Sequence, residues 1–244
     1  MATGTVLSLH RWPVKSMAGE RVDVLALDER GAAGDRAHVV VERRNGQERT
    51  LTARQAPRLL AWRGHYGRPP GAELRVDAVP EATIASPAGL RYHWGDPGLA
   101  SALSEDLGRD VRLERDLALR QDLRRSLLVT VEATRGAIGA ALGREFDLRR
   151  ARTNVHVALD AEAYAEEAWE GARLRSGSAV LELLHPCVRC AIPTRDPDDQ
   201  ERWPELLRWL TREHGGLFGI NARASGPGTI RVGDRVEVVA LPFD

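Results

Sequence analysis

The first 95 residues show the alternation of apolar and polar side chains that is typical of β-strands. Residues 22–27 have an apolar side chain at every second position, and residues 5–10 are interpreted as a strand of the same kind. Residues 39–41 and 73–79 are also predicted to be strands. Asn45-Gly46 lies between two such runs and predicts a hairpin. Because no crossover helix is evident between these strands, we expect antiparallel pairing in a barrel or a strongly curved sheet.

After residue 95 helical patterns appear. Asp96-Pro97 can begin a helix that Gly108 ends, Thr134 can cap a second helix over residues 135–142 that Gly143 closes, and a third helix begins near Pro204. Strand-like runs lie between and beyond them, at residues 126–131, 155–159, 179–185 and 235–241. The fold class is therefore expected to be α+β and strand-rich. We predict domains over residues 1–95 and 96–244, with one core shared by both halves as the alternative.

Composition narrows the class of protein. Of the 244 residues, 43% are apolar and 29% are charged, which is ordinary for a globular protein. Thirty-five basic side chains balance 35 acidic ones, so no net charge favours nucleic acid or an anionic membrane as a partner. No apolar run approaches the roughly 18 residues of a membrane span, and residues 1–11 lack a signal-peptide pattern. We expect a cytoplasmic protein without a membrane or nucleic-acid partner.

Basic residues are almost all arginine, because the chain holds 34 arginines and one lysine, Lys15. Such a bias commonly reflects nucleotide composition. The exception suggests that the site of Lys15 needs a compact ammonium group, for which a planar guanidinium is no substitute. Lys15 and Ser16 follow the first predicted strand, where an ammonium, a hydroxyl and turn N–H groups can form a small anion site.

The two cysteines, Cys187 and Cys190, form a C-x-x-C at the end of an apolar strand. Three interpretations are open. The two cysteines are small buried side chains, or they form part of a zinc site with His185, or they provide a thiolate that binds a soft metal or reacts with an electrophile. A thioredoxin-like dithiol is disfavoured because two prolines interrupt residues 191–197, where its helix would begin. The positive charges of Arg189 and Arg195 would favour the thiolate.

Further arginines stand beside amide or hydroxyl residues at strand edges. Each alone reads as a solvated surface arginine. Together they would suit an anionic ligand rich in heteroatoms, because arginine forks match phosphate and amides match a fused heterocycle. The segments are Gly34-Asp35-Arg36, Thr52-Ala53-Arg54-Gln55 and Arg152-Thr153-Asn154.

An ordered set of motifs resembles MOSC proteins, and the closest branch is that of the mitochondrial amidoxime-reducing component and its bacterial relatives. Residues 11–20, 34–36 and 52–55 are similar to the N-terminal β-barrel domain of that family. Later motifs are similar to the MOSC domain itself, namely Arg152-Thr153-Asn154-Val155, Pro186-Cys187-Val188-Arg189-Cys190, Asp196-Pro197-Asp198, Leu217-Phe218-Gly219-Ile220-Asn221 and Gly228-Thr229-Ile230-Arg231-Val232-Gly233-Asp234. The resemblance implies an N-terminal β-barrel-like domain followed by a MOSC domain with a mixed β-barrel core and flanking helices.

The resemblance also implies a molybdenum cofactor, Mo-molybdopterin, bound between the two halves. Cys190 matches the cysteine that ligates molybdenum, and Cys187 is its less important neighbour. The residues matched to the phosphate and the pterin are Lys15, Ser16, Arg36, Arg152 and Asn154, with Arg54 and Gln55 close by.

Three departures from the family pattern lie near this site. Thr153 stands where relatives have proline, Val188 replaces a small polar residue, and Pro193 replaces a hydroxyl residue. Because of these departures, the sequence does not identify the substrate.

The expected function is a molybdenum-dependent oxidoreductase that removes oxygen from small N-hydroxylated compounds or N-oxides in a two-electron step. No residue is an obvious general acid. Asp196, Asp198 and Asp199 are near the C-x-x-C in sequence, but we interpret them as part of a solvated surface loop. Two cysteines cannot hold an iron–sulfur cluster alone, so an external electron donor is required, either a flavoprotein or a ferredoxin- or cytochrome-type reductase. One alternative is a carrier of the cofactor or of its sulfur. Another is a binding or zinc-stabilised domain without the chemistry.

Overall fold

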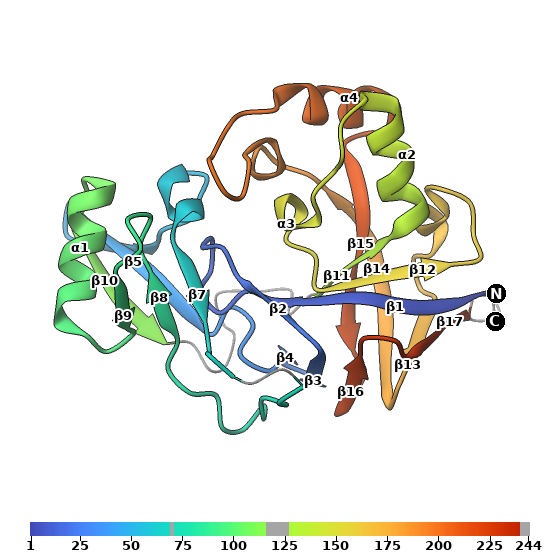
Figure 1. The fold of residues 1–244 in the computed structure, drawn as a ribbon, viewed down its shortest axis with the longest axis horizontal. Coiled ribbons are helices and arrows are strands. Elements are labelled where there is room, and N and C mark those ends of the chain that lie inside the picture. The colour runs from blue at the N-terminus through green and yellow to red at the C-terminus, as the bar shows by residue number, and fades with distance from the viewer. Residues whose placement is uncertain (69–70, 116–126, 240–244) are drawn as a thin grey trace.

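The computed structural model describes residues 1–68, 71–115 and 127–239, and a closed barrel of seven strands lies at one end of the molecule (Figure 1). The strand order is β12-β11-β15-β14-β13-β17-β1, and β1 pairs again with β12 to close the barrel. Only β11 and β12 run parallel, so the barrel is mixed. Its strands are β1 (Ala2–Arg11), β11 (Leu127–Val131), β12 (Val155–Leu159), β13 (Arg173–Ser176), β14 (Ala179–Val188), β15 (Leu217–Ala224) and β17 (Arg235–Val239).

Strand β1 closes a barrel that otherwise comes from the second half of the chain. Val6 and Leu9 of β1 are both buried in its core. Residues three apart face opposite sides of a regular strand, and the register shift between Val6 and Ser8 in the pairing with β12 accounts for the change of side. A side chain at Gly4 would collide with the carbonyl oxygen of Ala158 in β12, so glycine allows the two strands to meet. Conversely, two strands of the second half of the chain join sheets of the first half. Strand β10 (Val111–Arg115) pairs with β5 (His38–Arg44), and β16 (Gly228–Arg231) pairs with β3 (Val24–Asp28). Strand pairing thus crosses residue 95 in both directions.

The N-terminal half is built from short antiparallel sheets, as predicted. Their strand orders are β10-β5-β6, β16-β3-β4 and β7-β8-β9. The first and third contribute to a second core that includes Val40, Trp62 and Ile84, whereas β16-β3-β4 places Leu25, Leu27 and Ile230 in the barrel core. The predicted hairpin is confirmed, because Asn45 and Gly46 both have positive φ angles between β5 and β6. The remaining strands are β2 (Glu20–Val22), β4 (Gly31–Ala32), β6 (Gln47–Thr50), β7 (Arg63–His65), β8 (Thr83–Ala85) and β9 (Arg91–His93).

Two predicted strands differ in the structure. Residues 22–27 are split at Asp23, because β2 pairs with β1 whereas β3 joins the sheet of β16. The strand predicted over residues 73–79 is wrong. This segment has no ladder partner and crosses the second core with only Leu74 fully buried, while the side chains of Arg75 and Asp77 pair with each other. The alternation of apolar and polar side chains in residues 73–79 therefore belongs to a loop that packs on the second core.

The helices largely follow the prediction. Helix α1 (Pro97–Leu107) ends at Gly108 in a left-handed conformation, and α4 (Pro204–His214) buries Leu206 and Leu210. The predicted start of α2 (Glu132–Leu142) is wrong, since Thr134 lies inside this helix and its hydroxyl donates to Glu166 at 2.7 Å instead of capping. Short helices complete the fold, namely α3 (Leu148–Ala151), η1 (Pro57–Ala61), η2 (Ala165–Ala168) and η3 (Ile192–Thr194).

Some predictions fall beyond these residues. Ser126 and residues 240–241, at the ends of two predicted strands, lie outside the described residues. None of the helices in the described part of the chain is long and apolar enough to cross a membrane.

Candidate functional site

Asp35 joins three segments that are far apart in the sequence. Its buried carboxylate accepts hydrogen bonds from the Trp12 backbone N–H at 2.7 Å and the Asn154 side chain at 3.2 Å through Oδ1, and pairs with Arg36 at 2.7 Å through Oδ2. The Arg36 N–H also donates to the Trp12 carbonyl at 2.7 Å. Three of the segments singled out in the sequence therefore meet at one carboxylate.

Asn154 is a positioning residue in this structure. Its side chain is fully buried, donates to the carbonyl of His10 at 3.3 Å as well as to Asp35, and accepts from the N–H of Leu128 at 3.0 Å. The amide thus links β1, β11 and the Asp35 turn. Its predicted contact with a pterin stays a prediction.

The guanidinium of Arg152 lies at the centre of a positively charged group. It stacks 4.4 Å from the ring centroid of Trp12, and Nη1 donates to the Met17 carbonyl. Nη2 is buried and has no hydrogen-bond partner within the described structure. The pKa of Arg152 is lowered to about 9, chiefly by burial and then by the charges of Arg36 and Arg189, against the opposing effect of Asp35. Such a group is stabilised by an anion.

Arg189 connects this cluster to the C-x-x-C. Its Nη1 donates to the sulfur of Cys187 at 3.1 Å, and its Nη2 donates to the carbonyl of Ala151, the neighbour of Arg152, at 2.7 Å. Its Nε is buried without a partner in the described structure. Cys187 and Cys190 are free thiols, each partly exposed, and Cys190 lies in the loop between β14 and η3. Both cysteines therefore belong to a segment anchored beside Arg152.

Lys15 and Ser16 lie in a turn that is hydrogen-bonded to the segment of Arg36. The Lys15 N–H donates to the His38 carbonyl at 2.9 Å, and the His38 N–H donates to the Pro13 carbonyl at 3.1 Å. Lys15 is partly exposed, whereas Ser16 is buried. The backbone thus holds the only lysine of the chain beside the Asp35–Arg36 turn.

Backbone strain is concentrated at the predicted cofactor residues. Six described non-glycine residues have positive φ angles, and three of them are Ser16 at 70°, Arg36 at 52° and Arg152 at 59°. This left-handed conformation costs on the order of 1 kcal/mol for each such residue and is common at functional sites. The three lie in different segments, so the strain follows the site and not one loop.

Arg54 and Gln55 are exposed on a loop of the N-terminal half. The Gln55 side chain accepts from the N–H of Thr52 at 3.1 Å and from its hydroxyl, so it is folded back on its own loop. Within the described residues, neither side chain forms a hydrogen bond or an ion pair with the Asp35 cluster, and their part in cofactor binding stays a prediction.

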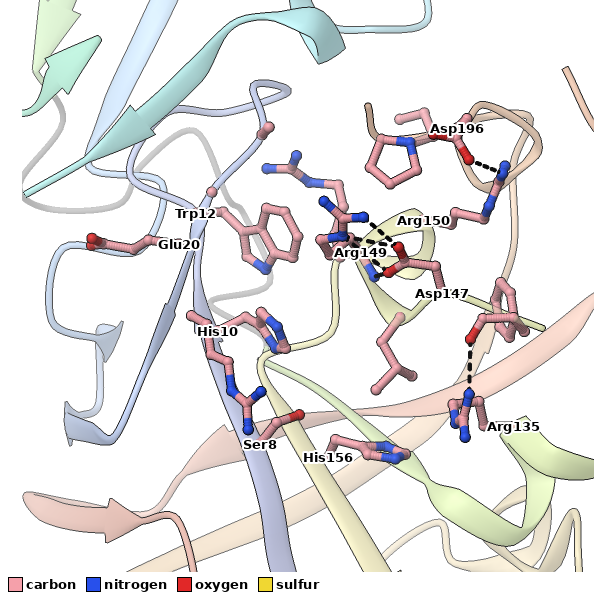
Figure 2. A pocket seen from close by; sticks show the side chains of 18 of the residues that line it. Ser8, His10, Trp12, Glu20, Arg135, Asp147, Arg149, Arg150, His156 and Asp196 are labelled. Carbon is pink, nitrogen blue, oxygen red and sulfur yellow. Dashed lines mark hydrogen bonds and ion pairs between the residues drawn. The ribbon is translucent and has the colours of Figure 1, made fainter. Parts of the chain in front are cut away.

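A cavity of about 650 Å³ lies beside Arg152, bounded by β1, α3 and residues 192–197 (Figure 2). Arg152 is the one predicted cofactor residue among its lining residues.

The sequence analysis assigns no role to Trp12 or Asp35, although both lie in motifs that resemble the MOSC family. An acidic residue directly before Arg36 was the available signal for Asp35.

The described residues contain no group of three or more His, Cys, Asp and Glu side chains that could hold a metal ion. His185 instead accepts a hydrogen bond from Asn221 at 3.0 Å through Nδ1. The carboxylates of the loop that follows η3 are also engaged in ion pairs, because Asp196 pairs with Arg150 and Asp198 pairs with Arg149. A zinc site built from His185 and both cysteines therefore has no support here.

Comparison with known proteins decides the family. The model of the MOSC domain matches residues 93–237, and that of the MOSC N-terminal beta barrel domain matches residues 3–90. The chain belongs to the MOSC family. MOSC domains are known as molybdenum-cofactor-binding domains, so the group of arginines beside the C-x-x-C stands in a family that binds an anionic metal cofactor. A search of curated proteins finds no match to this sequence.

A solved structure shares the fold of this MOSC protein. The YuaD protein of Bacillus subtilis is 17% identical with a TM-score of 0.54, and the match covers 99% of this chain and 98% of that one. YiiM of Geobacillus stearothermophilus is 16% identical with a TM-score of 0.38, over 46% of this chain and 53% of that one.

Proposed function

We propose that this protein is a molybdenum-cofactor-dependent oxidoreductase that reduces small N-hydroxylated compounds or N-oxides. The observation that carries the proposal is the buried Arg152, whose unpaired Nη2 lies in the field of Arg36 and Arg189 next to the C-x-x-C. A buried guanidinium repelled by its neighbours is costly unless an anion joins it. Mo-molybdopterin, with its phosphate and polar pterin, supplies that charge, and the residues present fit it.

The chain's own residues would divide the work of holding the cofactor. Lys15, Ser16 and Arg36 would bind the phosphate end, since they supply an ammonium, a hydroxyl and a guanidinium from segments joined by backbone hydrogen bonds. Arg152 would bind the pterin side and Cys190 would ligate molybdenum, a soft partner for a thiolate. Asn154 and Asp35 would hold these groups in place through the hydrogen bonds described above.

When bound, the cofactor would supply two-electron chemistry that removes an oxygen atom from the substrate. Reduction of an amidoxime to an amidine consumes two electrons and two protons and releases water. The carboxylates of Asp196 and Asp198 are paired with arginines, so neither is an obvious proton donor. We infer that the protons come from solvent, which reaches the partly exposed Cys190 loop.

The electrons would come from an external donor, a flavoprotein or a ferredoxin- or cytochrome-type reductase, in the cytoplasm. Both thiols of the chain lie in the C-x-x-C and would be occupied by this site. A cofactor or sulfur carrier is the alternative function. It would release the cofactor readily and would not consume a reductant.

The test is turnover of benzamidoxime with reduced methyl viologen as an artificial electron donor. We expect cofactor-loaded protein to oxidise two equivalents of reduced viologen, a one-electron donor, for each benzamidine formed. Cys190→Ser should abolish turnover, whereas the matched variant Cys187→Ser should keep at least a tenth of it. Loaded protein that retains molybdenum yet forms no benzamidine, and hands its cofactor to an apo-acceptor, would favour the carrier.

A further inference from the structure

The cavity of about 650 Å³ beside Arg152 has features that the cofactor proposal does not use. On one side it is lined by Ser8, His10 and Trp12 of the β1 segment, and on the other by residues of α3, and Figure 2 shows the His10 ring directed into the space between them. Neither cysteine is among its lining residues. The cavity therefore adjoins the cofactor cluster through Arg152 and Trp12 but is not the C-x-x-C site itself.

The acidic side chains of the cavity wall are paired with arginines. Every one of the five has an arginine partner within ion-pair distance. The pairs are Glu20 with Arg11, Glu132 and Glu145 with Arg135, Asp147 with Arg149, and Asp196 with Arg150. Because Glu132 and Glu145 share Arg135, these pairs leave one negative charge uncompensated on the wall.

Three guanidinium groups of the same wall are not neutralised. Arg21, Arg195 and Arg152 form no ion pair with any carboxylate in the described ranges 1–68, 71–115 and 127–239. Arg152 also keeps its buried Nη2 without a partner there. The charge left over in the cavity is therefore positive, and an anionic ligand would be favoured.

His10 adds an unpaired polar atom to the wall. Its Nδ1 is buried and lacks a hydrogen-bond partner within the described structure. The pKa of His10 is lowered to about 4, mainly by burial and then by Arg21, so the imidazole is neutral at pH 7. A neutral imidazole with an unsatisfied nitrogen suits a ligand that carries a polar group as well as an apolar body.

The wall also has apolar side chains, including Trp12, Phe146, Leu148 and Ile192. We propose that this cavity binds a small organic carboxylate, with its acid group at Arg152 and Arg195 and its apolar body against Trp12 and Leu148. The site would exist in cofactor-free protein, on which its binding is measured, because the cofactor of the proposed function would compete with the carboxylate for Arg152.

Titration calorimetry of the purified full-length protein with benzoate, against the isosteric neutral benzamide, tests the site. Benzoate should bind with one-to-one stoichiometry, and benzamide at least tenfold more weakly. Arg195→Gln should weaken benzoate binding at least fivefold. The matched control Arg44→Gln changes an exposed arginine of β5 outside the cavity and should leave the affinity unchanged. Ile192→Trp, which narrows the cavity, should also weaken binding.

Four outcomes would overturn the proposal. They are no benzoate binding, equal binding of benzoate and benzamide, equal loss in Arg44→Gln and Arg195→Gln, and loss in Lys15→Ala but not in Arg195→Gln. The last outcome would place the anion in the cofactor cluster. Urea denaturation of each variant confirms that it folds. Failure here leaves molybdenum content and turnover untouched, so it is distinguishable from failure of the proposed function.

Discussion

The guanidinium of Arg152 lies 4.4 Å from the ring centroid of Trp12, and this stacking holds a buried charge whose Nη2 has no partner in the described structure. Trp12 is itself fixed, because its indole N–H donates to the Thr153 carbonyl at 3.1 Å. Residues 140 positions apart thus hold one cation in place before any ligand arrives. Such preorganisation reduces the cost of binding an anion.

Arg152→Met should separate stability from binding. The substitution removes a buried charge that is repelled by Arg36 and Arg189, at the loss of one hydrogen bond and the stacking on Trp12. We expect the free energy of unfolding of cofactor-free protein to stay within about 1 kcal/mol of wild type or to rise. Pterin content after expression should fall at least tenfold. Urea denaturation and pterin fluorescence measure the two effects, and a large loss of stability with normal pterin would contradict this role.

Ser16→Gly should stabilise the cofactor-free protein by about 1 kcal/mol, because glycine adopts the φ angle of 70° without steric cost. The loss of the hydroxyl should lower pterin content. Asn45→Gly, at a hairpin position with a φ angle of 52°, is the matched control and should leave pterin content unchanged. Equal pterin content in both variants would remove Ser16 from the site.

Asn154→Ala should destabilise the protein by about 2–4 kcal/mol. The buried Asp35 carboxylate, the His10 carbonyl and the Leu128 N–H would each lose a hydrogen bond. Asn221→Ala, which removes a partly exposed amide from His185, should cost about 1 kcal/mol and serves as the comparison. Similar losses in urea denaturation would show that Asn154 does not have this linking role.

Acid should weaken the fold in a window set by two histidines. Burial lowers the pKa of His10 and of His38 to about 4, so both are neutral in the folded protein while the unfolded chain takes up protons below pH 6.5. Stability should therefore fall as the pH drops from about 6.5 to about 4, by up to about 3 kcal/mol for each residue. Urea denaturation across this range and NMR titration of the two imidazoles test the assignment. Midpoints near 6.5 for both rings would contradict it.

The sequence predicted most of the fold where local and tertiary signals agree. Residues 5–10 lie in strand β1 as predicted, and Gly108 ends α1 where the sequence places the end of a helix. It failed where a periodic pattern has another cause. In residues 73–79 only Leu74 enters the core fully, and Thr134 forms a tertiary hydrogen bond to Glu166 where a cap was expected.

The site was predictable as residue types but not as geometry. Motif order brought Lys15, Arg36, Arg152 and Cys190 into view, whereas convergence on Asp35 depends on contacts across more than 100 residues of sequence. Three left-handed backbone positions and the unpaired Nη2 of Arg152 become visible only in three dimensions.

The most direct test of the central claim is molybdenum and pterin analysis of protein produced in a host that makes the cofactor. Wild type is compared with Lys15→Ala, Cys190→Ser and the control Arg44→Gln. We expect close to one molybdenum and one pterin per chain in wild type and control, pterin loss in Lys15→Ala, and molybdenum loss in Cys190→Ser. Wild-type protein that carries neither molybdenum nor pterin under these conditions would contradict the account.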